Sequence, residues 1–326
     1  MRKSNDPKPE SIIRRHHKGR REHLRRVYRI LLMAVLAAVF VVCAVNLIGY
    51  GIDYLRAKQA SESLRAAYYA NAALPQVTMP PVSTPSPRPQ ATRQYTVQTA
   101  TPVATSSVLQ KVAYPSNPYG IISSRFDRIR RQNADIVGWL TIEGMLDEAV
   151  VQRDNSYYLK RDYKGYHNAN GAIFLDEDCR LDSRPYTLML YGHNMKTGAM
   201  FGNLRYYDDI NYYRKHPFMT FDTLYEDGRY VVFASCIIST EAGNWRSISF
   251  SDLTGTNRAA REEAIRGLLS CSDYKCAINI RSDDQLLLLI TCTGDDTQRR
   301  IVAARRVRAD ETEEELMTGV NRTTKR

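Results

Sequence analysis

The sequence predicts a mainly β protein, a closed or nearly closed β-barrel with short helices, which follows a membrane-spanning helix and a stalk. Three observations support this fold: a charge-free apolar run near the amino terminus, a proline-rich stretch after it, and seven short β-type runs in the rest of the chain. Many short strands separated by loops are typical of barrels and sandwiches. Along the 326 residues we expect five segments, 1–29, 30–52, 53–118, 119–309 and 310–326.

The first two segments predict a membrane anchor. Residues 30–52 contain no charge in 23 residues, and at about 1.5 Å per residue they can cross a hydrocarbon core of about 30 Å as a tilted helix. Residues 1–29 carry a net +8 of the chain's +11. By the positive-inside rule, this basic tail is cytoplasmic and the chain from residue 53 is extracellular, on an uncleaved single-pass anchor in the cell membrane. The basic charge therefore belongs to a membrane flank, and we expect no nucleic-acid partner.

The next segment, 53–118, is expected to be a juxtamembrane helix followed by a stalk. Residues 75–118 hold 9 of the 13 prolines and 12 Ser or Thr, without an acidic residue. Such a composition cannot bury a hydrophobic core and favours an extended spacer. We expect one globular domain after it, over 119–309, and a polar tail over 310–326.

The globular domain is predicted to open with a short helix and to continue as strands. A helical-looking insert, clearest at 257–270, lies between the fifth and sixth strands. The seven expected strands are 136–142, 149–152, 171–176, 186–193, 229–239, 286–292 and 300–307.

Two of these strands end in residues that can carry chemistry. Cys292 ends an apolar run and is followed by a polar loop, and His193 ends another apolar run. An imidazolium beside a thiol stabilises the thiolate and can protonate a leaving amine. Five cysteines follow the anchor, an odd number, so at least one is expected to be free. Cys271 and Cys276 are either a local disulfide or two free thiols.

An arginine pair, Arg299 and Arg300, opens the strand after Cys292. A guanidinium is permanently charged and offers several donors in a fixed fork, so it can stabilise an oxyanion. Because side chains alternate along a strand, only one of the two faces the site. The spacing alone does not say which.

Together these residues resemble the sortases, and class B sortases in particular. The resemblance covers about residues 123–308 in the family's order. It is carried by Tyr191-Gly192-His193-Asn194, Thr291-Cys292 and Arg300-Ile301-Val302, with support from 133–140, Asp154-Asn155, 171–176 and Met200-Phe201.

The resemblance implies a closed eight-stranded barrel and a set of site residues. His193 and Cys292 match the catalytic pair, and Arg300 rather than Arg299 matches the oxyanion-stabilising arginine. Asn155 and Leu159 match positions that line the sorting-signal groove, and Thr291 is expected to bind substrate beside them. Where relatives often have Ser or Ala two residues before the cysteine, this chain has Ile290. The chemistry implies no cofactor and no metal.

The expected function is therefore that of a cysteine transpeptidase. It would cleave the sorting signal of a surface protein through a thioester on Cys292 and transfer the acyl group to a peptidoglycan or pilin amine. One alternative is a hydrolytic cysteine protease at the cell surface that uses the same residues. The other is a non-enzymatic wall-binding module.

Overall fold

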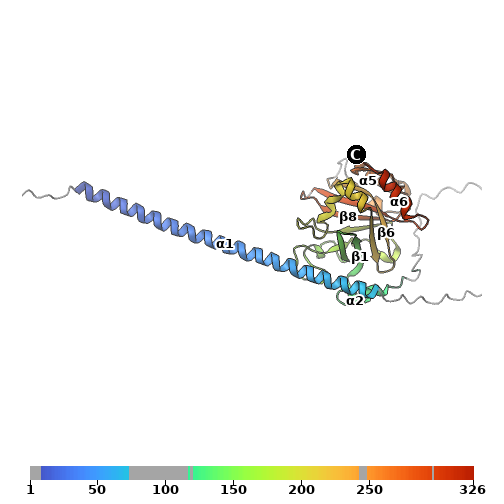
Figure 1. The fold of residues 1–326 in the computed structure, drawn as a ribbon, viewed down its shortest axis with the longest axis horizontal. Helices are drawn as coiled ribbons and strands as arrows, with labels where there is room; N and C mark the ends of the chain where they lie inside the picture. Colours follow the sequence, from blue (N-terminus) through green and yellow to red (C-terminus); the bar gives the residue numbers. More distant parts are fainter. Residues whose placement is uncertain (1–8, 73–116, 118–119, 242–247, 296) are drawn as a thin grey trace, which may run out of the picture. The chain divides into compact units, whose positions relative to one another are not determined.

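Eight strands close into a barrel, in the order β1-β2-β3-β4-β8-β9-β6-β5, which confirms the predicted fold (Figure 1). The computed structural model describes residues 9–72, 117, 120–241, 248–295 and 297–326. The barrel strands are β1 Ile136–Ile142, β2 Leu146–Val151, β3 Ile173–Leu175, β4 Thr187–Tyr191, β5 Phe218–Thr223, β6 Arg229–Ser239, β8 Leu286–Cys292 and β9 Gln298–Arg306. A separate two-stranded sheet pairs β7 Tyr274–Lys275 with β10 Thr324–Lys325.

Helices and 3-10 turns fill the connections. The α-helices are α1 Pro9–Ala72, α2 Asp127–Arg130, α3 Ile210–Lys215, α4 Phe250–Thr254, α5 Arg258–Cys271 and α6 Glu313–Arg322. The 3-10 turns are η1 Ser124–Phe126, η2 Tyr157–Lys160, η3 Leu181–Ser183 and η4 Gly202–Asp208. The predicted insert between the fifth and sixth expected strands corresponds to α4 and α5.

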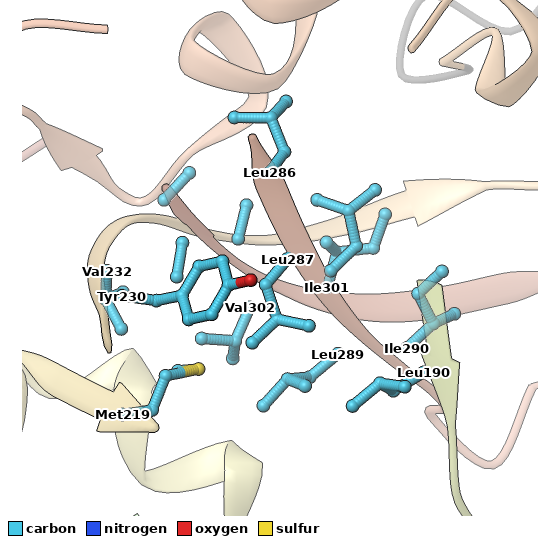
Figure 2. Packing of buried hydrophobic residues seen from close by; sticks show 14 of the residues in the cluster. Leu190, Met219, Tyr230, Val232, Leu286, Leu287, Leu289, Ile290, Ile301 and Val302 are labelled. Atoms are coloured by element: carbon cyan, nitrogen blue, oxygen red, sulfur yellow. The ribbon is translucent and has the colours of Figure 1, made fainter. Parts of the chain in front are cut away.

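The barrel core packs side chains from strands that are far apart in sequence. Figure 2 shows Met219 of β5, Tyr230 of β6, Leu190 of β4 and Leu289 of β8 within this core, and all are at least 94% buried. Burying one such side chain stabilises the fold by about 1.5–3 kcal/mol. In the middle of this core, β8 is paired in parallel with β4 and antiparallel with β9.

The compact unit that contains the barrel runs from Ala60 to Arg326, and residues 1–59 form a second unit. The barrel unit is therefore larger than the predicted domain, 119–309. At its start, Leu64 and Tyr68 of α1 are 1% and 2% exposed. They belong to a second apolar cluster, which also contains Trp139 of β1.

At the carboxyl end, the predicted polar tail contains the helix α6. Thr312 and Glu315 form a reciprocal capping box at its start, and the buried Leu316 and Val320 join the barrel core. The sequence analysis did not predict this helix, because the segment is acidic and only two of its apolar residues are buried.

Within the described residues, one helical segment, Arg26–Gly49, is long and apolar enough to cross a membrane, with a mean hydropathy of 2.9. It overlaps the predicted span, although a signal sequence would share these properties. The proline-rich part of the predicted stalk lies outside the described residues, apart from residue 117.

Candidate active site

Cys292 is the last residue of β8 and the first in that strand whose side chain reaches solvent. The six preceding residues, Leu286 to Thr291, are all buried, whereas Cys292 is exposed. The strand is paired on both sides, with β4 and with β9. The thiol therefore stands at the surface on a rigid support, as a nucleophile requires.

His193 reaches the same end of the barrel because β4 and β8 run in parallel. Tyr191 is paired with Ile290, and the N–H of Gly192 donates to the carbonyl of Ile290 at 3.3 Å. His193 and Cys292 each follow this last pair by two residues. Alternate residues of a strand share a face, so the side chain of Cys292, which ends β8, lies on the face that carries Ile290.

The imidazole of His193 is oriented by a backbone carbonyl. Its Nε2 lies 2.6 Å from the carbonyl oxygen of Leu159. A carbonyl only accepts hydrogen bonds, so Nε2 carries the hydrogen in the neutral ring and Nδ1 is left to accept a proton. The carbonyl of His193 accepts from the N–H groups of Met195 and Phe201, at 3.1 and 3.0 Å. No sequence motif pointed to the Leu159 carbonyl.

The two arginines at the start of β9 lie in different surroundings. Arg299 is the partner of Cys292 across the antiparallel pair, and Arg300 is the partner of Thr291. Directly opposed residues project to the same face, so the register puts Arg299, not Arg300, on the face of the thiol. Arg300 is 8% exposed and forms an ion pair with Asp208 of η4, a partner that the sequence analysis did not identify.

The three expected substrate-binding residues differ in accessibility. Leu159 is 39% exposed beside His193, so its side chain can meet a peptide. The amide of Asn155 donates to Asp176 at 3.2 Å and accepts from the N–H of Glu177 at 3.0 Å, which fixes it in a loop. Thr291 is 3% exposed, and its hydroxyl has no hydrogen-bond partner among the described residues.

A cavity of about 480 Å³ lies beside β4, and its lining does not include His193, Cys292 or Leu159. Met189 and Tyr191 line it from the strand, and Phe250 and Ser251 line it from α4. Tyr191 donates its hydroxyl hydrogen to Asp176 at 3.0 Å, at the edge of the same cavity. The cavity thus combines an apolar strand face with a few fixed polar groups, as peptide and ligand sites do.

Of the five cysteines that follow α1, all of them in the described part of the chain, Cys292 alone is exposed, and none forms a disulfide. Burial raises the pKa of Cys179 to about 12 and also raises the pKa of Cys276. A buried thiol that stays protonated is a poor nucleophile. Cys271 and Cys276 are separate free thiols. No cluster of three His, Cys, Asp or Glu residues suited to a metal ion occurs within the described ranges.

Solved structures that are similar to this barrel are class B sortases or proteins described as similar to them. No protein-family model matches the chain. It is 28% identical over 195 residues to Sortase B of Listeria monocytogenes, covering 59% of this chain and 76% of that protein. A Bacillus anthracis protein described as similar to sortase B is 30% identical, with a TM-score of 0.52, and the match covers 60% of this chain and 88% of that one. The chain belongs to the class B sortases.

Two Staphylococcus aureus comparisons agree with this assignment. Sortase B of that organism is 28% identical over 190 residues, covering 57% of this class B sortase and 75% of the relative. The solved S. aureus sortase B–substrate complex is 26% identical, with a TM-score of 0.52, covering 58% and 88% of the two chains. The present class B sortase is therefore a cysteine transpeptidase.

Proposed function

We propose that this sortase cleaves the sorting signal of surface proteins through a thioester on Cys292 and transfers the acyl group to a peptidoglycan or pilin amine. The observation that supports the proposal is the parallel register of β4 and β8, whose last pair, Tyr191 with Ile290, precedes His193 and the exposed Cys292 by two residues each. Two relatives support the substrate classes. One was solved as a substrate complex, and another, 25% identical with a TM-score of 0.50, was solved in complex with triglycine.

In the first half of the reaction, the thiolate of Cys292 attacks the peptide carbonyl that follows a Thr-like residue. A carbon–sulfur bond forms, and the carbonyl oxygen takes the negative charge. The carbon–nitrogen bond then breaks, and the imidazolium of His193 gives its Nδ1 proton to the leaving amine. In the second half, an acceptor amine attacks the thioester and loses a proton to His193. The thiolate leaves, and a new amide bond remains.

We assign stabilisation of the two oxyanions to Arg299. Its pairing with Cys292 supports this role, because both side chains project from the same face. The family resemblance favoured Arg300. In the structure that guanidinium is buried against Asp208, which suits a residue that ties η4 to β9.

The sorting signal is proposed to occupy the cavity along β4 and to pass the exposed side chain of Leu159. The cavity is lined by Tyr191, two residues before His193, and Asn155, which donates to Asp176 at its edge, would orient the peptide. Thr291 would contribute through its backbone, because its side chain is buried.

The proposed location is the cell membrane, with residues 1–29 in the cytoplasm and the barrel unit outside. The apolar segment Arg26–Gly49 and the basic flank before it support this topology. Treating protoplasts with protease should digest the barrel unit and leave a short membrane-protected fragment. Complete protection of the barrel would contradict the proposed topology.

The reaction is tested with a library of quenched fluorescent peptides that carry Thr at the cleavage position, with and without triglycine. Wild-type protein should join peptide to triglycine, Cys292→Ala should lose all turnover, and Cys179→Ala should stay active. If the peptide is hydrolysed to the same extent with and without triglycine, and no peptide–triglycine product forms, the protein is a protease. A folded wild-type protein that forms no thioester with any peptide would favour a wall-binding module.

A further inference from the structure

Residues 60–70, near the end of α1, pack against the outside of the barrel; we call them the docked segment. The ring of Tyr68 stacks on Trp139, with ring centroids 4.3 Å apart and planes within 6°. Leu64, one turn earlier, is 1% exposed. The docked segment therefore completes the second apolar cluster instead of passing over it.

Polar contacts hold the docked segment in one position along β1, β2 and β5. Three acidic side chains of these strands each meet a side chain of the segment: Ser61 with Glu148 at 2.8 Å, Arg65 with Asp147 at 2.9 Å, and Tyr68 with Asp222 at 2.8 Å. Because these contacts lie on successive turns of the helix, they fix its rotation as well as its position.

The same cluster extends to the loop that precedes the site. Tyr158 of η2 and Tyr163 are members of it, and Tyr163 donates its hydroxyl hydrogen to the carbonyl of Ala60 at 3.2 Å. The amide of Asn133 donates to the Tyr158 hydroxyl at 2.7 Å and to the Tyr163 carbonyl at 2.5 Å. The docked segment and η2 are thus parts of one packed and hydrogen-bonded layer.

Leu159 of η2 contacts the proposed catalytic histidine, His193. Leu159 follows Tyr158 and accepts from Nε2 of His193. Gly171, with φ +62°, lies against the Tyr158 and Leu159 carbonyls and the His193 ring, and leaves no room for a side chain. A Cβ atom there would lie 2.7 Å from the Tyr158 carbonyl oxygen, 2.8 Å from that of Leu159 and 3.1 Å from Cδ2 of His193.

We propose that the docked segment is a positioning element for His193. By completing the cluster around Tyr158 it holds the Leu159 carbonyl in place, and this carbonyl keeps the hydrogen on Nε2 and leaves Nδ1 toward Cys292. The inference rests on the proposed function for its effect on turnover. Its effect on the imidazole tautomer does not depend on that function.

The test compares variants of the full chain in detergent micelles. Tyr68→Ala removes the ring on Trp139, Tyr68→Phe keeps the ring and removes the hydroxyl, and Glu62→Ala alters an exposed position of the same helix. A misplaced catalytic group of about 1 Å costs up to about 100-fold. We therefore expect Tyr68→Ala to lower kcat by about 10- to 100-fold with KM within about twofold, Tyr68→Phe to lower kcat less because the ring remains on Trp139, and Glu62→Ala to match wild type.

A second readout separates positioning from mere stability. In ¹⁵N-histidine-labelled protein, with the His193 signals assigned by their loss in His193→Gln, wild type should show the Nε2–H tautomer and Tyr68→Ala a mixture. If Tyr68→Ala does not fold, Tyr163→Phe takes its place: it removes the hydroxyl that donates to Ala60 at 3.2 Å and to Gln132 at 3.5 Å, and it should shift the same signals in the same direction. Unchanged tautomer and kcat in folded Tyr68→Ala would overturn the inference. An inactive wild type with the expected tautomers would overturn only the proposed function.

Discussion

Replacing Arg299 and Arg300 one at a time tests the register of the hairpin that β8 and β9 form. Arg299 is paired with Cys292, so Arg299→Ala should remove a donor from the developing oxyanion. Loss of one such donor typically lowers kcat by about 10²–10³, which corresponds to about 2.7–4 kcal/mol. Arg299→Lys keeps the charge but loses the fork, and it should recover only part of this loss. Neither change should lower Tm much, because Arg299 is only half-buried.

Arg300→Ala should lower Tm and leave kcat nearly unchanged. It leaves Asp208 without its ion-pair partner. Breaking a fully buried pair costs about 3–5 kcal/mol, but the side chain of Asp208 is 47% exposed, and water can solvate the remaining carboxylate. A cost of about 1–2 kcal/mol follows, or a fall in Tm of about 2–8 °C for a unit of this size. At 25 °C, kcat should stay within about fivefold of wild type.

The assay is steady-state transfer of one fluorescent sorting peptide to triglycine, with kcat and KM measured separately and Tm recorded for each variant. A loss of about 100-fold in folded Arg300→Ala, with near-normal turnover in Arg299→Ala, would refute the register argument. The oxyanion role would then return to Arg300, as the family resemblance implies. It would also mean that this side chain leaves Asp208 during the reaction.

Three further predictions concern the parts of the barrel unit around the site. Burial raises the pKa of Glu148 above its usual value of 4.5, so the folded state loses stability as pH rises from below 4.5 through the raised pKa. Glu148→Gln should therefore raise Tm at pH 7 and leave it unchanged below pH 4. Gly171→Ala should lower kcat at least tenfold, since its methyl group meets the Leu159 carbonyl. A soluble fragment that begins at residue 60 should match the full chain in activity and Tm, whereas one that begins at 119 should melt lower because it lacks Leu64 and Tyr68. Equal Tm values for Glu148→Gln and wild type at both pH values, full activity in Gly171→Ala, or equal melting of the two fragments would each contradict the matching prediction.

Most of the barrel was predictable because its strands are strongly apolar. All seven expected strands occur, since runs such as 286–292 bury both faces and have no competing helical period. The eighth strand, β5, was not found from its own residues. Phe218–Thr223 alternates half-buried and buried positions, and Thr and Asp occupy part of that pattern. It follows a proline in a charged stretch, so its strand character depends on pairing with β1 and β6.

The helical boundaries of the barrel unit were harder to predict because their signals are short. In α6 the spacing of Thr312 and Glu315 is a capping-box pattern visible in the sequence, but only two buried apolar residues follow it. The docked segment was expected to be helical, yet nothing local shows that Tyr68 has a partner. That partner, Trp139, lies in β1, and only the folded barrel brings the two rings together.

The site itself shows where prediction from local pattern ends. The strands β4 and β8 were found from their own residues; Cys292 ends β8, and His193 follows the end of β4 by two residues. Which arginine faces the thiol depends instead on the turn between β8 and β9, because one residue more or less in that turn exchanges the faces of Arg299 and Arg300. The strand and turn propensities of the residues do not fix the number of residues in this turn. The pairing of the two strands does, because it joins Ile290 to Ile301 and Cys292 to Arg299. This pairing decides which arginine lies opposite the thiol, and a substitution that shifts it should therefore affect catalysis.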